Sequence, residues 1–468
     1  MSDFDFVVIG GGSAGYAAAR TAADEGLKVA VIDGAKELGG LCILHGCMPS
    51  KTLIESANRL QDIRGAEEFG LSVKDPSFDG TKIIARKRRL IAEFARYRTE
   101  QLESGKFALI RGHARFTGPC NLAVQLAGGG GQTVQASAIL VATGSVIRHP
   151  DIHGLGEAAP MNSDDVLDNA NPPKSLVVLG AGPIALEMAH YHRALGSIVT
   201  VIQRSKQVLR SMDADVANAV QRGMERHGTK FILGCRIIAT GKSARGKWVR
   251  VAHDDREETI EADEILLALG RDPATAGLDL GAAGLALKGL PLPTTDTQQT
   301  LVPHIFGAGD VTGRLEVVHI AIEQGEIAAR NAARLLRAAG EPLEAIDYRL
   351  RLFAVFTEPE AAMVGLTERE AGELGLDFAA AAYPFDDHGK SIVHGRTDGF
   401  VKLIADRRSG EIIGGAVVGP HASELIHEVV VAMRYRATVG QFLKIPHYHP
   451  TLSEIWTYPA EELAGQIP

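Results

Sequence analysis

The alternation of apolar and polar stretches predicts two copies of one strand–turn–helix–strand unit. The first copy opens with the apolar run DFVVIG, passes through an Ala-rich helical stretch and closes with KVAVID. The second copy, SLVVLGAGPIALEMAHYHRALGSIVTVIQ, repeats this order further along the chain. Short apolar runs that are bounded by glycine turns and joined by one helix are typical of parallel strands in an α/β fold.

The pattern changes after Tyr348. The runs GFVKLIAD and IIGGAVVG resemble strands, and the stretch SELIHEVVVAMRYRA that follows them resembles a helix. This order lacks the earlier strand–helix alternation and indicates a separate α+β domain. We therefore predict an α/β protein with two Rossmann-like dinucleotide-binding units and a C-terminal α+β domain.

Glycines stand in each unit where a dinucleotide would need them. Gly10, Gly12 and Gly15 form G-x-G-x-x-G directly after the first strand, and Asp33 ends the second strand. The first glycine allows a tight turn, the second admits a pyrophosphate, and the third allows close packing of helix on strand. Asp33 stands where a carboxylate accepts hydrogen bonds from a ribose.

The second unit carries the same motif, with Gly180 and Gly182 in the first two places and Ala185 in the third. Two such units imply two dinucleotides, and the economical interpretation is hydride transfer between a flavin and a nicotinamide. Further turns after predicted strands add candidate cofactor contacts. These candidates are Thr143 and Gly144 in ATGS, Gly270 in ALGRDP, Asp310 in GAGDVTG for a polyol hydroxyl, and Gly40 ahead of the first cysteine.

Composition excludes some classes of binding partner and indicates the cellular compartment. A net charge of −8 with interspersed signs argues against nucleic acid or an anionic membrane as the main partner. No apolar run approaches the length of a bilayer span, and the chain enters its first strand too early for a signal peptide. Four cysteines in 468 residues are too few for a disulfide scaffold, so we expect a cytoplasmic protein.

The cysteines Cys42 and Cys47 are separated by four residues and are followed at once by Pro49 and Lys51. That spacing is too wide for a zinc knuckle or for a thioredoxin-like pair, and we assign no metal site. In a reducing compartment a close pair of this kind indicates a catalytic or metal-binding role rather than a structural one. Near the C-terminus, the stretch HYHPTLSE places histidines close to Glu454. A His–Glu pair is the usual means of moving the proton of a thiol.

The chain resembles the class I flavin-dependent pyridine nucleotide–disulfide oxidoreductases, and above all their dihydrolipoyl dehydrogenase branch. The resemblance rests on GGGSAG, GGLCILHGCMPSK, ATGS, GAGPIALE, IFGAGD and HYHPTLSE, which occur in the family's order. It implies a homodimer and four segments along the chain. These are an FAD-binding domain in two parts, 1–148 and 272–346, an inserted NAD(P)-binding domain, 149–271, and a dimerisation domain, 347–468.

The resemblance also assigns roles. Cys42 and Cys47 correspond to a redox-active disulfide at the start of a helix, with Cys42 as the interchange thiol and Cys47 against the flavin. Lys51 corresponds to a lysine that pairs with a glutamate near flavin N5, and the match for that glutamate is Glu187. His449 corresponds to the catalytic base and Glu454 to its orienting carboxylate. His447 and His45 are expected to be a supporting and a flanking residue. In the family's dimer, one subunit supplies the disulfide and its partner the histidine.

Some features leave alternatives open. Ser50 before Lys51 matches dihydrolipoyl dehydrogenases, whereas glutathione reductases carry two lysines there. The nicotinamide unit ends its second strand in Gln203 instead of the Glu of NAD-specific members, and the cations Arg204, Lys206 and Arg210 follow. Guanidinium groups suit a 2′-phosphate, so we lean to NADP(H), although Gln203 could serve NAD.

A dihydrolipoamide-like dithiol is the predicted substrate. The alternatives are an NADPH-dependent, glutathione-reductase-like enzyme, a flavin reductase for quinones or another acceptor, and a subunit docked to a larger acyltransferase assembly.

Overall fold

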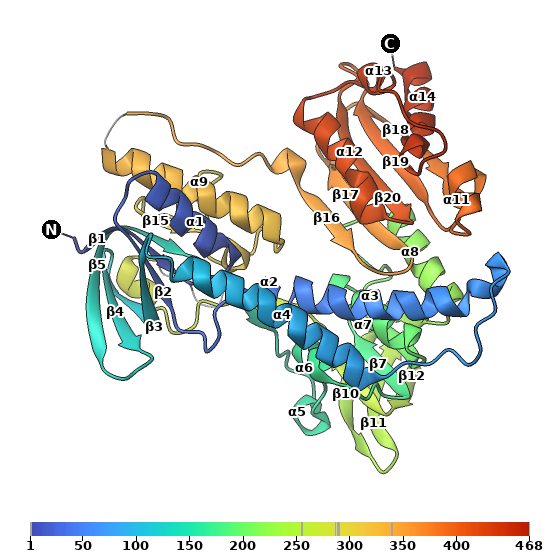
Figure 1. Ribbon diagram of the computed structural model, residues 1–468, viewed down its shortest axis with the longest axis horizontal. Coiled ribbons are helices and arrows are strands. Elements are labelled where there is room, and N and C mark those ends of the chain that lie inside the picture. The colour runs from blue at the N-terminus through green and yellow to red at the C-terminus, as the bar shows by residue number, and fades with distance from the viewer. Residues whose placement is uncertain (1, 254–255, 286, 288–290, 338–339, 468) are drawn as a thin grey trace. The chain divides into compact units, whose positions relative to one another are not determined.

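The computed structural model describes residues 2–253, 256–285, 287, 291–337 and 340–467 (Figure 1). The chain forms two compact units. Unit 1 comprises Met1–Ser50, Ala85–Arg148 and Gly270–Asp347. Unit 2 comprises Lys51–Ile84, His149–Leu269 and Tyr348–Pro468.

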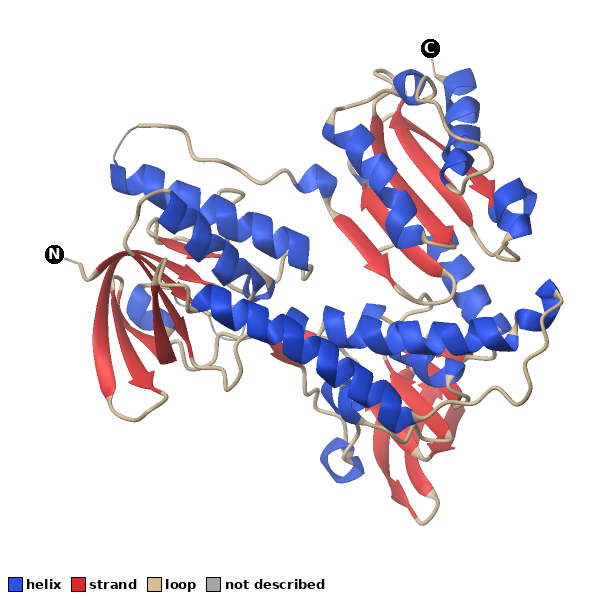
Figure 2. Cartoon of the chain, in the orientation of Figure 1, coloured by secondary structure: helices blue, strands red, loops and turns tan. Residues whose placement is uncertain are grey.

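Unit 1 is built on a parallel sheet. Its strands β15 (Ile305–Gly307), β5 (Gly131–Val141), β1 (Phe4–Ile9), β2 (Val29–Asp33) and β3 (Ala108–Gly118) lie side by side in that order (Figure 2). Val8 at the centre of the sheet lies opposite Val31 on one side and Leu140 on the other. Strand β4 (Asn121–Leu126) pairs antiparallel with β3 and β5.

Both faces of the parallel sheet are buried, which explains why its strands are almost continuously apolar. Phe6 and Val8 belong to a core that also contains buried alanines of α1 (Ser13–Asp24) and α9 (Val318–Arg337). Val7 and Ile9 belong to a second core that contains side chains of β3, β4 and β5. The two sets alternate along β1 because successive strand residues point to opposite faces.

Unit 2 contains a second parallel sheet. Its order is β13 (Glu264–Leu267), β7 (Ser175–Leu179), β8 (Ile198–Gln203) and β9 (Lys230–Leu233), and α7 (Pro183–Ala194) follows β7. Strands β10 (Arg236–Ser243), β11 (Gly246–His253) and β12 (Arg256–Ala262) form a separate antiparallel sheet.

The C-terminal part of unit 2 is an antiparallel sheet. Its order is β16 (Leu352–Val355), β17 (Glu360–Gly365), β20 (Ile412–Gly419), β19 (Phe400–Asp406) and β18 (Phe378–Pro384). Helices α12 (Ala422–Arg434) and α14 (Thr457–Gln466) share its apolar core. Trp456 is completely buried there and donates its indole N–H to the Leu425 carbonyl over 3.2 Å.

The predicted fold class, with two Rossmann-like units and a C-terminal α+β part, is confirmed. Within the described residues, no helix is long and apolar enough to cross a membrane. The remaining helices and strands are α2 (Gly40–Leu44), α3 (Cys47–Arg64), α4 (Gly80–Leu102), β6 (Ser145–Ile147), α5 (Leu155–Ala158), α6 (Ser163–Asp168), α8 (Ala214–Arg226), β14 (Arg271–Pro273), α10 (Glu368–Glu373), α11 (Gly389–Val393) and α13 (Val439–Phe442).

Candidate active site

The glycine loop of unit 1 has a shape that only glycine permits. Gly10 has a φ of +104°, and a Cβ there would lie 2.5 Å from the Ala142 carbonyl oxygen. A Cβ at Gly15 would lie 1.8 Å from the Gly10 carbonyl oxygen. Gly12 is the N-cap of α1 and supplies no side-chain cap. The first N–H groups of α1 therefore suit an anion, and the loop fits the pyrophosphate of a dinucleotide.

Asp33 at the end of β2 holds this loop in place. Its Oδ2 accepts the backbone N–H of Gly11 over 2.8 Å, and its Oδ1 accepts that of Ala35 over 2.8 Å. Each carboxylate oxygen retains a second acceptor site for a hydroxyl. The sequence indicated a ribose contact at Asp33 but gave no sign of this bond to the glycine loop.

A second group of polar side chains follows the neighbouring strands β5 and β15. Ser145 donates its hydroxyl to Asp310 Oδ2 over 2.6 Å, and Arg271 Nε donates to the Ser145 hydroxyl over 2.8 Å. The hydroxyl oxygen of Thr143 is buried and has no hydrogen-bond partner among the described residues. Gly144 next to it has a φ of +74°. A buried hydroxyl without a partner beside a carboxylate fits a site that a polar cofactor completes.

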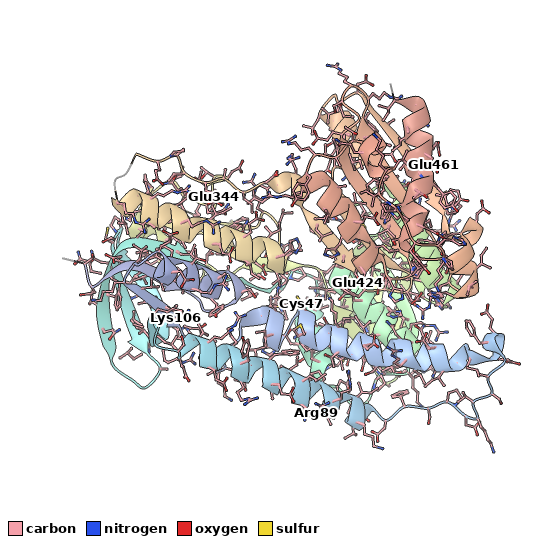
Figure 3. The ribbon with its side chains drawn as sticks, turned by 45° about the horizontal axis from the view of Figure 1, so that its top comes forward. Cys47, Arg89, Lys106, Glu344, Glu424 and Glu461 are labelled. Atoms are coloured by element: carbon pink, nitrogen blue, oxygen red, sulfur yellow. The ribbon has the colours of Figure 1, made fainter. Side chains whose placement is uncertain are left out.

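The cysteines Cys42 and Cys47 lie in unit 1, in a segment whose start contacts the glycine loop. A Cβ at Gly40 would lie 2.6 Å from Gly12 Cα, so the start of this segment packs directly on the loop. Cys42 lies in the short helix α2, whereas Cys47 is the first residue of α3 (Figure 3). The expectation of one helix start for both cysteines is therefore corrected, because α2 ends at Leu44. Both side chains are partly exposed, and a helix start favours a thiolate at Cys47.

Helix α3 also carries Lys51, which meets Glu187 of α7. The Lys51 ammonium lies 2.7 Å from Glu187 Oε2 and 4.8 Å from the centre of the Phe356 ring. Glu187 is buried, and its Oε1 accepts the Phe356 backbone N–H over 3.2 Å. The resemblance predicted the Lys–Glu pair. Nothing in the sequence indicated Phe356, because its contact arises only from tertiary packing.

In the second glycine motif, too, one glycine lies so close to another part of the backbone that a Cβ would not fit. Gly180 has a φ of +109°, and a Cβ there would lie 2.4 Å from the Ala268 carbonyl oxygen. Gly182 is the N-cap of α7, and a Cβ at this position would meet no described atom within 4 Å. The start of α7 is therefore accessible to a phosphate. Gly270, which was predicted from a later turn, belongs to unit 1 and has a φ of +109°.

Cationic side chains follow the end of β8. Gln203 accepts the Arg204 backbone N–H at its own Oε1 over 2.9 Å, and the side chains of Arg204 and Arg210 are exposed. Arg210 and Lys206 line a pocket of about 490 Å³, together with Arg369 of α10. Arg369 donates to the Arg210 carbonyl over 3.3 Å. Sequence reasoning missed Arg369 because it lies 159 residues away along the chain.

His449 and Glu454 form a hydrogen-bonded pair in the C-terminal part. His449 Nδ1 lies 2.9 Å from Glu454 Oε2 and 3.2 Å from Oε1. The histidine side chain is 80% exposed, whereas that of Glu454 is only 12% exposed. A buried carboxylate that holds one ring nitrogen leaves the other nitrogen of an exposed ring able to act as a base.

The other candidate histidines lie elsewhere. His447 Nε2 lies 2.5 Å from Glu428 Oε1, and its Nδ1 lies 3.0 Å from the Ile445 carbonyl oxygen. His447 therefore belongs to a separate pair. His45 is the C-cap of α2 and donates its backbone N–H to Leu41 over 2.9 Å. His388, for which the sequence gave no signal, lies 3.4 Å from Glu454.

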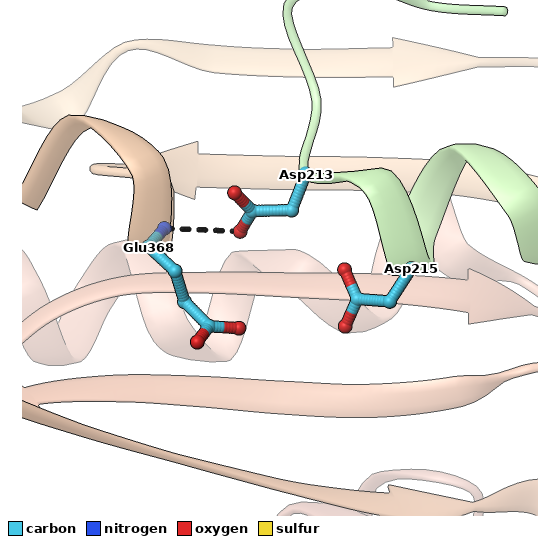
Figure 4. Close-up of side chains that lie close together, drawn as sticks. All are labelled: Asp213, Asp215 and Glu368. Carbon is cyan, nitrogen blue, oxygen red and sulfur yellow. Dashed lines mark hydrogen bonds between the residues drawn. The ribbon is translucent and has the colours of Figure 1, made fainter. Parts of the chain in front are cut away.

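Three carboxylates outside these sites lie close together: Asp213, Asp215 and Glu368 (Figure 4). The buried ammonium of Lys402 lies 2.8–3.0 Å from all three. Burial opposes the charge, but hydrogen bonds to Glu368 and Asp215 outweigh it and raise the pKa of Lys402. The cluster is thus an ion-pair network around a lysine and not a vacant cation site.

Residues 4–325 match the family model for pyridine nucleotide-disulphide oxidoreductase, and residues 353–460 match the dimerisation domain of that family. A dihydrolipoyl dehydrogenase of Chlamydia muridarum is 35% identical over 457 residues, which cover 97% of this chain and 95% of the relative. One of Thermus scotoductus is 33% identical, with 100% and 98% covered.

Two solved structures share the fold along nearly the whole chain. LpdA of Mycobacterium tuberculosis superposes with a TM-score of 0.87 at 30% identity, covering 98% of this chain and 99% of that one. The HOCl-induced flavoprotein disulfide reductase RclA of Escherichia coli, solved as a Cu(II) complex, gives a TM-score of 0.84 at 26% identity, covering 99% and 100%.

Proposed function

The chain belongs to the pyridine nucleotide-disulphide oxidoreductase family, and from this premise we propose that it oxidises a dithiol of the dihydrolipoyl type. The enzyme uses FAD and a nicotinamide. The observation that carries the substrate proposal is the likeness to dihydrolipoyl dehydrogenases over essentially the full length, with Cys42 and Cys47 on the segment that packs on the glycine loop.

Most of the residues that we assign to FAD lie in unit 1, whereas Lys51 belongs to unit 2. The glycine loop Gly10–Gly15 would hold the pyrophosphate, and Asp33 would bind a ribose. Thr143 and Asp310 would bind the polyol hydroxyls. At Gly40 and Gly144 the protein backbone would contact the cofactor. Bound FAD supplies a two-electron carrier between the cysteine pair and the nicotinamide. The chain divides after residues 148, 269 and 347, near the proposed domain boundaries at 148/149, 271/272 and 346/347, whereas residues 51–84 of the proposed FAD segment belong to unit 2.

The cysteine pair exchanges disulfides with the substrate. One substrate thiolate attacks Cys42 Sγ, the Cys42–Cys47 bond breaks, and Cys47 leaves as a thiolate at the start of α3. The second substrate thiolate then attacks the mixed disulfide and releases Cys42. The substrate leaves as a disulfide, and the cysteines hold its two electrons. Lys51, which follows Cys47 by one turn of α3, is anchored by Glu187.

His449 accepts one of the two protons that the substrate thiols lose, and the departing Cys42 sulfur takes the other. Glu454 holds Nδ1, so Nε2 faces outward as the base and the resulting imidazolium is stabilised by the carboxylate. Because the His449 ring is exposed, it can serve a disulfide that lies outside the C-terminal domain. We propose that the enzyme is a homodimer in which His449 of one subunit serves the cysteines of the other.

Support for the dimer comes from the matched dimerisation domain and from its surface. Apolar side chains stay exposed on that part of the chain, including Val393 (69%), Val431 (58%), Tyr435 (81%) and Tyr448 (81%). Exposed aromatic and aliphatic side chains of this kind are typical of protein interfaces. The cytoplasmic location stays a prediction.

We also propose that NADP(H) is the preferred nicotinamide. Glycines Gly180 and Gly182 would approach the pyrophosphate, and the exposed cations Arg204 and Arg210 would contact a 2′-phosphate. Gln203 supports this proposal because it carries no negative charge to repel that phosphate. An NADPH preference would also suit a disulfide reductase that runs in the opposite direction.

The experiment that tests the function is steady-state kinetics with dihydrolipoamide, oxidised glutathione and a quinone, each with both nicotinamides. We expect dihydrolipoamide to give the highest kcat/KM and Cys42→Ser to abolish its turnover. Higher kcat/KM with glutathione would favour the reductase alternative. Quinone turnover that survives in Cys42→Ser, with none on dithiols in the unaltered enzyme, would contradict the proposal.

A further inference from the structure

Glu454 lies between two histidines, and only one of them was expected. His449 Nδ1 approaches Oε2 to 2.9 Å, and His388 Nε2 approaches Oε1 to 3.4 Å. The two rings differ sharply in exposure, because the side chain of His449 is 80% exposed and that of His388 is 0% exposed. The carboxylate therefore connects a solvent-facing ring to one inside the core.

The surroundings of His388 fix its ring. His388 Nδ1 lies 2.8 Å from the hydroxyl oxygen of Ser391, which is also buried. The rings of Phe385 and Tyr458 contact it edge-on, with centroid separations of 6.4 and 6.3 Å. A ring held on three sides cannot turn to find another partner for Nε2. Glu454 is the polar group that this nitrogen faces.

The protons in this group can be assigned by elimination. Burial lowers the pKa of His388, so the ring is neutral and carries one proton. If that proton were on Nδ1, a nitrogen lone pair would face the ionised carboxylate inside the core, which is unfavourable. If it is on Nε2, it points at Glu454, and the Ser391 hydroxyl donates to Nδ1. The second arrangement leaves no lone pair against the charge.

We propose that His388 is a positioning residue that donates its Nε2 proton to Glu454 and thereby holds this carboxylate against His449. The inference rests on the role proposed for His449 as the base. The 3.4 Å separation is longer than a full hydrogen bond, and among the described residues Nε2 makes no bond of ordinary length. A small rotation of the Glu454 carboxylate toward Nε2 would shorten this contact to a full hydrogen bond.

Among the described residues, few charged or titratable groups surround the group formed by His449, Glu454 and His388. Glu454 faces His449 and His388. Tyr458 of α14 stacks on Tyr383 of β18 at 4.0 Å. The Tyr383 hydroxyl donates to Asp387 Oδ2 over 2.9 Å, and burial together with that bond raises the pKa of Tyr383 to about 12. The tyrosine therefore stays neutral over the working pH range.

Loss of the His388 donor has a predictable sign. A carboxylate that loses a hydrogen-bond donor holds a proton more tightly. The proton shared by the His449–Glu454 pair is then bound more tightly, and the acid limb of the pH profile of kcat/KM moves to higher pH. Because the carboxylate is also less well fixed, kcat/KM falls about tenfold.

Two amide substitutions test this assignment. In His388→Gln the amide nitrogen can reach the place of Nε2, whereas in His388→Asn it reaches only the place of Nδ1. We expect Gln to keep the pH profile of kcat/KM and the His449 pKa measured by NMR without substrate, and Asn to shift both upward. His388→Leu should behave like Asn, and thermal unfolding of all three variants reports any general loss of structure.

The outcomes separate this inference from the proposed function. Equal behaviour of Gln, Asn and Leu, or an unshifted His449 pKa in Asn and Leu, would show that His388 merely fills space. The control is His449→Gln, which we expect to be nearly inactive. If His449→Gln keeps full activity, the base assignment fails; the NMR measurement still decides whether His388 donates to Glu454.

Discussion

The ammonium of Lys51 lies 2.7 Å from the carboxylate of Glu187 and joins helix α3 to helix α7. Cys47 begins α3, and Lys51 follows one turn later. The carboxylate is 5% exposed and also accepts the Phe356 N–H, so it is fixed at both oxygens. Within unit 2, the pair thus ties Lys51 of α3 to helix α7, which begins at the second glycine motif.

Lys51→Met should therefore damage both stability and turnover. Removal of the ammonium leaves a buried carboxylate without its charge partner, and because Lys51 is 31% exposed we expect a loss of about 1–2 kcal/mol in unfolding free energy. The kcat for dihydrolipoamide should also fall, and by more than the loss of unfolding free energy alone would explain. Chemical denaturation and kcat measure the two effects.

The matched control is Arg59→Met on the same helix. Arg59 pairs with Glu55 at 2.7 Å, but both side chains are largely exposed, at 73% and 48%. Its loss should cost less than about 0.5 kcal/mol and leave turnover intact. Equal effects of the two substitutions would remove any special role from the Lys51–Glu187 pair.

Helix α7 contains a second testable feature, the buried His192. Neither ring nitrogen has a hydrogen-bond partner among the described residues, and burial lowers the pKa of His192 from 6.5 to about 4. The folded protein therefore binds this proton less readily than the unfolded chain. The stability due to the neutral ring is present above pH 6.5 and is lost as the pH falls toward 4.

His192→Phe should consequently flatten the acid side of the stability profile. Relative to the unaltered enzyme, we expect the variant to gain about 3 kcal/mol between pH 6.5 and pH 4. The control His427→Phe changes an exposed side chain of α12 and should leave the profile unchanged. Parallel profiles for the unaltered enzyme and His192→Phe, measured by denaturant unfolding, would contradict the assignment.

The preference for a nicotinamide depends on exposed cations. If Arg204 and Arg210 bind a 2′-phosphate, kcat/KM should favour NADPH, and Arg204→Ala should reduce this preference by roughly one to two decades. The substitution should leave NADH kinetics nearly unchanged, because NADH lacks that phosphate. Lys242→Ala, an exposed cation of β10, serves as the control. Better use of NADH by the unaltered enzyme would restore NAD as the cofactor.

The parts of the fold that the sequence predicted are those encoded locally. The glycines at 10, 15 and 180 could be recognised from their spacing within one strand–turn–helix unit. The contacts that exclude a Cβ at Gly10 and Gly180 are with the carbonyl oxygens of Ala142 and Ala268, far along the chain, and only that of Gly15 is local. Lys51 and Glu187 lie 136 residues apart, so spacing alone could not pair them and only the family resemblance did so.

Other site features depend on tertiary packing and had no local signal. His388 stands in an ordinary polar stretch, DDHGK, and becomes notable only because folding buries it against Glu454. Asp33 was assigned to a ribose, yet both of its oxygens first serve the backbone of the glycine loop. The division of the cysteine segment into two helices, α2 with Cys42 and α3 beginning at Cys47, was likewise not foreseen.

The last prediction concerns the shared active site. Cys47→Ser and His449→Gln homodimers should each be nearly inactive, the first because the redox pair is broken and the second because the base is lost. When the two variants are co-expressed at equal levels, about half of the dimers are mixed. In a mixed dimer, one active site lacks both residues and the other has both intact. If the sites work independently, activity returns to roughly a quarter of that of the unaltered enzyme.

Differently tagged subunits allow the mixed dimer to be purified, so that its activity is measured without the two parent homodimers. Half of the unaltered activity per mixed dimer is then expected. If His449 served the cysteines of its own chain, no arrangement of the two variants would contain a complete site. Purified mixed dimers that retain FAD but show no turnover would therefore rule out an active site built from two subunits.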